Sequence, residues 1–167
     1  MAEQWMIAAR KPEPMAQVRV ERHPALASAD QGRYQGLDEP SEIRVLGESF
    51  RLDQLPYLLA FSGDKPLGAV SLALYGDDLL LLGFERQPDL GLPGVCAAIL
   101  DEALAVGREI GRGRLLAPLT NADALPFFFL QAEGFALVEV KPYDGPQRQG
   151  LGGILATHEL LLERVIG

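Results

Sequence analysis

Small residues of the kind that bring a backbone close to a phosphate group occur at residues 90–107, which read LGLPGVCAAILDEALAVG. A glycine-rich turn leads here directly into an apolar, helix-forming stretch. The first amides of a helix lack partners within the helix, and with the helix dipole they bind anions. The stretch fits a phosphate-binding turn, but also a turn that only begins a core helix, because short glycine motifs have many false positives.

Few other residues have side chains and positions suited to catalysis or to binding a metal or ligand. Glu85, near the end of a strand expected over 79–87, fits a solvated carboxylate at a strand end. His23 and His158 are far apart, and no cluster of cysteines and carboxylates accompanies them, so we expect no metal site. Residues 150–153 read GLGG but do not precede a helix, so we interpret them as a flexible loop.

The composition indicates one globular domain. The chain has 167 residues, of which 48% are hydrophobic and 23% charged, enough for a single core. Lys and Arg number 15 against 23 Asp and Glu, and the net charge of −8 disfavours nucleic acid or an anionic membrane as a partner. The single cysteine excludes a disulfide framework, and we expect neither a membrane span nor a signal peptide. We therefore expect a cytoplasmic protein.

Strands precede the glycine-rich turn in the predicted order of elements. We expect residues 1–14 to form a tail or arm and residues 15–167 to form the domain. Alternation predicts a strand over 16–20, and three strands over 57–63, 67–74 and 79–87 form an antiparallel meander. The mixed pattern of residues 41–56 allows no assignment.

Helices and strands alternate after the turn. Apolar residues spaced by three and four predict a helix that begins near Val95 and ends at the glycines of 107–113. A strand over 114–120 follows, so we expect a right-handed crossover that sets this strand parallel to 79–87. A helix over about 123–132, a strand over 135–140, a loop over 141–153 and a strand over 154–165 complete the chain.

This order of elements resembles the GNAT superfamily of acyltransferases, which use acetyl-CoA or another acyl-CoA. The segments that carry the resemblance are GLPGVCAAILDEALAVGREIG, RLLAPLT, DALPFFFLQAEGF and THELLLE, and it extends over most of residues 16–165. It implies an α/β fold with one mixed, twisted sheet of about six or seven strands flanked by helices. In this family the strands on either side of the phosphate-binding helix splay apart, which Pro118 fits, unless it marks an ordinary bulge.

The resemblance also implies a site for acetyl-CoA as co-substrate. Glu85 stands where several relatives carry a base for the acceptor amine. The implied CoA contacts lie at the end of the strand over 79–87, in the turn and the start of its helix, and on the second helix: Phe84 and Arg86; Gly91, Gly94, Val95, Cys96 and Ala97; Asn121, Asp123 and Phe129.

The sequence departs from the family pattern within this site. Gly91 replaces an Arg or Gln, Cys96 replaces a Gly or Ala, and Pro93 removes a backbone N–H. Leu130 stands at the usual tyrosine that protonates the CoA thiolate, and leucine cannot donate a proton. Asp123 stands at the usual asparagine. Asn121, two residues earlier, either caps the helix or partly replaces that amide.

Three hypotheses therefore stand side by side. The first is transfer of an acetyl group from acetyl-CoA to an amine of a small molecule or protein. The second is a non-catalytic acyl-CoA sensor or interaction module, favoured by Gly91, Pro93 and Leu130. The third is a structural homodimer, favoured by the apolar final strand and by Trp5. We expect contacts to an acceptor within residues 21–56 and 141–153.

Overall fold

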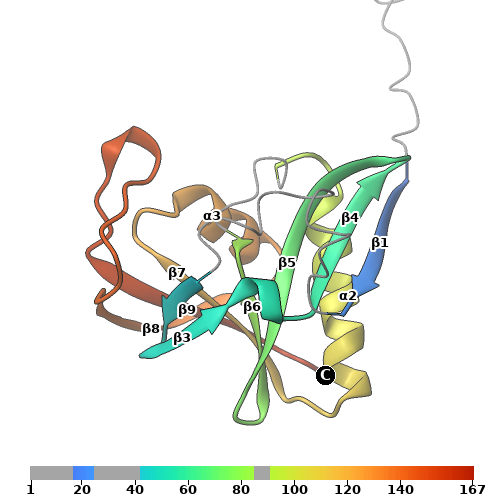
Figure 1. Ribbon diagram of the computed structural model, residues 1–167, viewed down its shortest axis with the longest axis horizontal. Helices are drawn as coiled ribbons and strands as arrows, with labels where there is room; N and C mark the ends of the chain where they lie inside the picture. The colour runs from blue at the N-terminus through green and yellow to red at the C-terminus, as the bar shows by residue number, and fades with distance from the viewer. Residues whose placement is uncertain (1–16, 25–41, 85–90) are drawn as a thin grey trace, which may run out of the picture.

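A computed structural model of the protein describes residues 17–24, 42–84 and 91–167. The expectations for residues 1–14 and for Glu85 and Arg86 lie outside the described residues. The described chain forms a seven-stranded mixed sheet in the order β1-β4-β5-β6-β7-β9-β8 and a separate two-stranded sheet, with two α-helices (Figure 1). This confirms the predicted α/β fold.

The strands of the large sheet are β1 (Val18–His23), β4 (Tyr57–Ser62), β5 (Lys65–Tyr75), β6 (Asp78–Leu82), β7 (Arg114–Thr120), β8 (Ala136–Pro142) and β9 (His158–Val165). The small sheet is a hairpin of β2 (Glu42–Val45) and β3 (Glu48–Arg51). The helices are α2 (Val95–Glu109) and α3 (Ala124–Ala132), and two short 3-10 turns cover Leu52–Gln54 and Leu151–Gly153.

The predicted meander and the predicted parallel pairing across the helix are both confirmed. β4, β5 and β6 pair antiparallel in chain order, and β6 pairs parallel with β7 across α2. Two strands are shorter than expected. β6 ends at Leu82 because Gly83 follows with a positive φ of 92°, which breaks the extended backbone. β9 begins at His158 rather than at residue 154, because the preceding segment bonds to Asn121.

The sheet is covered on both faces. α2 and α3 pack on one face, where Leu79 and Leu81 of β6 join the main core cluster. The β2–β3 hairpin packs on the other face, where Leu80 and Leu82 join a second cluster. Because side chains alternate along a strand, a run of four leucines is buried on both sides, as expected for a central strand next to a parallel neighbour.

The parallel ladder between β6 and β7 is short. Among the described residues, only Leu79–Leu115 and Leu80–Leu116 pair across it. β7 continues to Thr120 and stays paired with β9 on its other side. Pro118 lies in this continuation, opposite Leu161, where the missing proline N–H removes no bond toward β6. The carboxyl end of β7 thus has an open edge within the described chain.

Candidate functional site

The turn before α2 leaves backbone amides available at the helix start. Gly94 is the N-cap residue with a φ of 82°, a left-handed conformation that suits glycine. The Val95 N–H donates to the Leu92 carbonyl at 3.2 Å. Among the described residues, the amides of Cys96 and Ala97 have no acceptor, and no acidic side chain lies in the first turn. These amides can therefore receive an anion.

The side chains around this turn mostly belong to the core. Phe84 and Val95 are each 1% exposed, and Cys96 is 7% exposed within the same cluster. A Cβ built on Gly91 would meet the ring of Phe129 at 3.2 Å, so the turn packs directly on α3. The structure thus brings together two of the three segments for which CoA contacts were predicted, the turn and α3. At Val95 and Cys96, only the backbone is placed to reach a ligand.

Cys96 is predicted to resist thiol reagents. Burial, together with the nearby Glu133 carboxylate, raises the pKa of its thiol to about 12. The thiol is then protonated at pH 8, and a protonated thiol is a poor nucleophile. We expect labelling with Ellman's reagent to be slow in the native protein and complete after unfolding in guanidinium. Native labelling as fast as that of a free thiol would contradict this burial.

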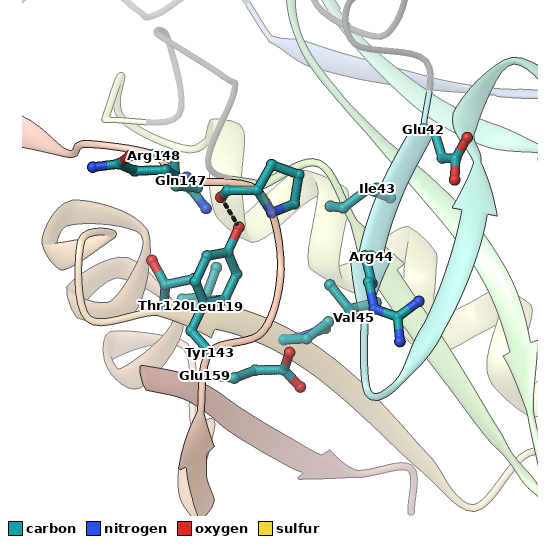
Figure 2. Close-up of a pocket in the computed structure, with 12 residues that line it drawn as sticks. Glu42, Ile43, Arg44, Val45, Leu119, Thr120, Tyr143, Gln147, Arg148 and Glu159 are labelled. Carbon is teal, nitrogen blue, oxygen red and sulfur yellow. Dashed lines mark hydrogen bonds between the residues drawn. The ribbon is translucent and has the colours of Figure 1, made fainter. Parts of the chain in front are cut away.

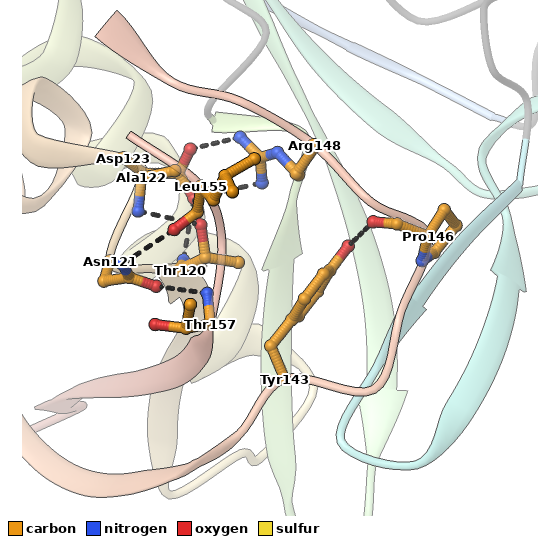
Figure 3. A network of polar contacts seen from close by, with 9 residues as sticks. All are labelled: Thr120, Asn121, Ala122, Asp123, Tyr143, Pro146, Arg148, Leu155 and Thr157. Carbon is orange, nitrogen blue, oxygen red and sulfur yellow. Dashed lines mark hydrogen bonds and ion pairs between the residues drawn. The ribbon is translucent and has the colours of Figure 1, made fainter. Parts of the chain in front are cut away.

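The side-chain amide of Asn121 forms hydrogen bonds with backbone groups of the protein. Its Oδ1 accepts hydrogen bonds from the N–H groups of Thr157 at 2.8 Å and His158 at 3.0 Å, and its Nδ2 donates to the Leu155 carbonyl at 3.0 Å (Figure 3). These bonds tie the end of β7 to the segment before β9. The N-cap of α3 is Asp123, and no side chain caps this helix, so the expectation that Asn121 caps it is wrong.

Asp123 is held in a second set of polar contacts. Its carboxylate, in a residue that is 5% exposed, accepts hydrogen bonds from the Thr120 N–H at 2.7 Å and the Thr120 hydroxyl at 3.1 Å. It also pairs with Arg148, which reaches it from the segment before β9 (Figure 3). All of these hydrogen bonds join Asn121 and Asp123 to other residues of the protein. The role of the two residues in binding CoA therefore stays a prediction.

Gly150, the first residue of the GLGG segment, packs closely against neighbouring backbone. The Gly150 N–H donates to the Ile154 carbonyl at 2.8 Å. A Cβ on Gly150 would lie 1.9 Å from the carbonyl oxygen of Ala122, so any larger residue would force the backbone apart. The interpretation of residues 150–153 as a flexible loop is therefore wrong at Gly150, which holds the segment against the turn that follows β7.

A pocket of about 280 Å³ lies on the hairpin face of the sheet, beside the open end of β7 (Figure 2). Four segments far apart in the sequence form it, including parts of the two ranges expected to contact an acceptor. The lining residues are Glu42, Ile43, Arg44 and Val45 of β2; Pro118, Leu119 and Thr120 of β7; Tyr143, Pro146, Gln147 and Arg148; and Glu159 of β9.

Glu159 is the functional candidate that sequence reasoning missed. The residue is 6% exposed, and its Oε1 accepts a hydrogen bond from the Leu46 N–H at 3.0 Å. Burial raises the pKa of the carboxyl group, although the Leu46 hydrogen bond opposes this. The alternation of the final strand could have indicated the position, because Glu159 lies on the same face as Leu161, which packs toward the hairpin.

Comparisons with known proteins identify the fold. No family model matches the sequence, and no curated protein matches it at a significant level. Many solved structures match. The IAA acetyltransferase from Bacillus cereus shares 13% identity at a TM-score of 0.64 and covers 89% of this chain and 99% of its own. The ribosomal-protein-S18-alanine N-acetyltransferase from Escherichia coli shares 12% identity at a TM-score of 0.60, covering 90% and 95%.

A third neighbour carries a ligand. The GNAT family acetyltransferase from Elizabethkingia anophelis, with acetyl-CoA bound, shares 12% identity at a TM-score of 0.61 and covers 89% of this chain and 97% of its own. The protein therefore has the GNAT fold, as the resemblance implied.

No helix in the described part of the chain is long and apolar enough to cross a membrane. Residues 17–24, 42–84 and 91–167 contain no group of three or more His, Cys, Asp or Glu residues that could hold a metal ion.

Proposed function

We propose that the protein transfers an acetyl group from acetyl-CoA to an amine. The observation that carries this proposal is the arrangement of the turn before α2 and the pocket around the parallel strands β6 and β7. The β6–β7 ladder ends after Leu80–Leu116, α2 begins with unpaired amides, and the pocket borders the open end of β7. A phosphorylated co-substrate bound at the start of α2 can extend along the open edge of β7 toward the pocket, where a second substrate can bind. The neighbour with acetyl-CoA bound supports the choice of co-substrate.

Backbone groups would make the main contacts to the CoA pyrophosphate. The amides of Cys96 and Ala97 are oriented by the helix, and the helix dipole adds to their attraction for an anion. Gly91 supplies no cationic side chain and Pro93 no N–H, so this turn has fewer donors than the family pattern. The affinity for CoA then depends strongly on the local backbone conformation at Gly94.

The reaction joins the acceptor nitrogen to the acetyl carbon. The lone pair of a neutral amine attacks the thioester carbonyl, the C–S bond breaks, and its electron pair leaves on the CoA sulfur. One amine proton is lost to a base and one proton reaches the thiolate, which gives an amide and free CoA. Glu85 remains the candidate base. Leu130 is fully buried and has no proton to give, so water is the proton source that we propose for the thiolate.

Acetyl-CoA is predicted to stabilise the protein against heat. A ligand at about 100 times its dissociation constant adds about 2.7 kcal/mol, which for a chain of this size raises Tm by about 5–10 °C. Thermal unfolding with and without millimolar acetyl-CoA measures this shift, with AMP as the control that lacks the pyrophosphate and pantetheine arm. Equal curves with and without acetyl-CoA would contradict the proposed site.

A non-catalytic acyl-CoA sensor is the second candidate, and Leu130 is the observation that favours it. The side chain at the usual tyrosine position is 0% exposed and packs in the main core. The two functions differ in a thiol-release assay with a panel of amines. Release of CoA that depends on an amine supports transfer, whereas a thermal shift without such release supports the sensor.

A further inference from the structure

The cationic side chains around the pocket have carboxylate partners of their own. Each of these pairs lies at the pocket wall or on the neighbouring strand β8, so their charges are largely balanced locally. The pairs are Arg44 with Asp144 at 3.7 Å, Lys141 with Glu139 at 3.2 Å, and Arg148 with Asp123.

Glu159 lacks such a partner. One carboxylate oxygen accepts the Leu46 N–H, and the other makes no hydrogen bond or ion pair within the described part of the chain. Figure 2 shows the carboxylate between Tyr143 and the β2–β3 hairpin, within the pocket. The exposed carboxylate of Glu42 lines the same pocket. Lys141 acts on Glu159 electrostatically but is itself paired with Glu139, so the pocket contains a buried carboxylate that makes no ion pair with a cation of the described chain.

We propose that Glu159 binds the ammonium group of the acceptor, an amine that is cationic in neutral water and gives up one proton to the base before it attacks the thioester. This inference rests on the proposed function. A carboxylate that accepts a hydrogen bond from an ammonium group forms a charge-assisted bond, stronger than one between neutral groups. The ring of Tyr143 adds an aromatic surface that attracts cations. Ile43, Val45 and Leu119 offer apolar contact to the rest of the molecule.

The test compares an amine with its neutral analogue. Phenethylamine is charged at pH 7, and 2-phenylethanol has the same carbon skeleton with a hydroxyl group instead. Isothermal titration of the full chain should show that the amine binds about tenfold or more tightly than the alcohol, since a hydrogen bond to a charged group contributes about 1.5–3 kcal/mol. In Glu159→Gln the amine and the alcohol should bind with about equal affinity. Glutamine retains an oxygen for the Leu46 N–H, so the fold should persist.

Glu163→Gln is the matched control. It removes the same charge from the same strand, but Glu163 pairs with Arg114 at 2.6 Å and does not line the pocket. This variant should keep the preference for the amine. The proposal is overturned if Glu159→Gln also keeps it, or if the wild-type protein binds the amine no better than the alcohol.

The acetyl-CoA thermal shift separates this proposal from the proposed function. It should be equal in the wild type and Glu159→Gln, because the start of α2 lies on the other face of the sheet from the pocket. A shift without amine preference overturns the role of Glu159 and leaves acetyl-CoA binding intact. An amine preference that depends on Glu159, without any acetyl-CoA shift, supports the ammonium site and contradicts the transferase.

Discussion

Replacement of Gly94 with glutamate is expected to abolish acetyl-CoA binding. The new carboxylate would lie next to the free amides of Cys96 and Ala97, where the pyrophosphate is proposed to bind. Two unit charges of the same sign at 4 Å repel by about 4 kcal/mol at the effective dielectric of a protein surface, which weakens affinity about 1000-fold. The thermal shift with millimolar acetyl-CoA should disappear.

Gly111→Glu provides the control for charge and backbone strain. Gly111 has a φ of 72°, close to the 82° of Gly94, and follows the opposite end of α2 with nothing within 4 Å of an added Cβ. Either substitution places an L-residue in a left-handed conformation, at a cost of about 1–2 kcal/mol. Both variants carry this strain, while the helix dipole favours a carboxylate at position 94 and disfavours one at position 111. Only Gly111→Glu should keep the acetyl-CoA shift. A full shift in Gly94→Glu would place the anion elsewhere.

The central part of the fold was predictable because local patterns there agree with the tertiary structure. Turn signals separate three strongly apolar strands, so the meander over β4–β6 follows from sequence alone. The helical spacing after Gly94 then requires a crossover, and the handedness rule sets β7 parallel to β6. The only errors in this region concern where strands end, and Gly83 shows why: a single positive φ ends β6.

The β2–β3 hairpin was not predictable from its pattern. Its turn consists of Leu46 and Gly47, both with positive φ, at 53° and 74°. Asparagine or aspartate before glycine is the usual signal for such a turn, and a leucine in a left-handed conformation is rare. The tertiary structure supports it, because Leu46 packs on the second core cluster and its N–H bonds to Glu159.

The pocket was only partly predictable for a different reason. Residues 21–56 and 141–153 were expected to contact an acceptor, and Arg44 and Tyr143 from those ranges line it. Pro118 and Glu159 come from strands that pair only in the folded sheet. The alternation of β9 places Glu159 on one face of the strand, but no local pattern indicates that a hairpin formed more than a hundred residues earlier lies on that face.

Asp123→Ala is expected to destabilise the protein more than any single loss of a surface contact. The substitution leaves the buried N–H and hydroxyl of Thr120 without their acceptor and Arg148 without its partner. An unsatisfied buried donor costs about 1–3 kcal/mol, and breaking the partly buried pair with Arg148 adds to this cost, so we expect a loss of about 3 kcal/mol. Urea unfolding should show a lower midpoint at an unchanged slope.

Asp123→Asn separates this structural role from the predicted contact with CoA. Asparagine keeps an oxygen for the Thr120 N–H but loses the ion pair, so we expect a loss of about 1 kcal/mol. Because asparagine is the usual residue of the family pattern at this position, the affinity for acetyl-CoA should not fall. Asp101→Ala, on the exposed face of α2, should stay within about 0.5 kcal/mol of the wild type. If Asp123→Asn instead weakens acetyl-CoA binding at unchanged stability, the carboxylate contacts the co-substrate and its bond to Arg148 is secondary.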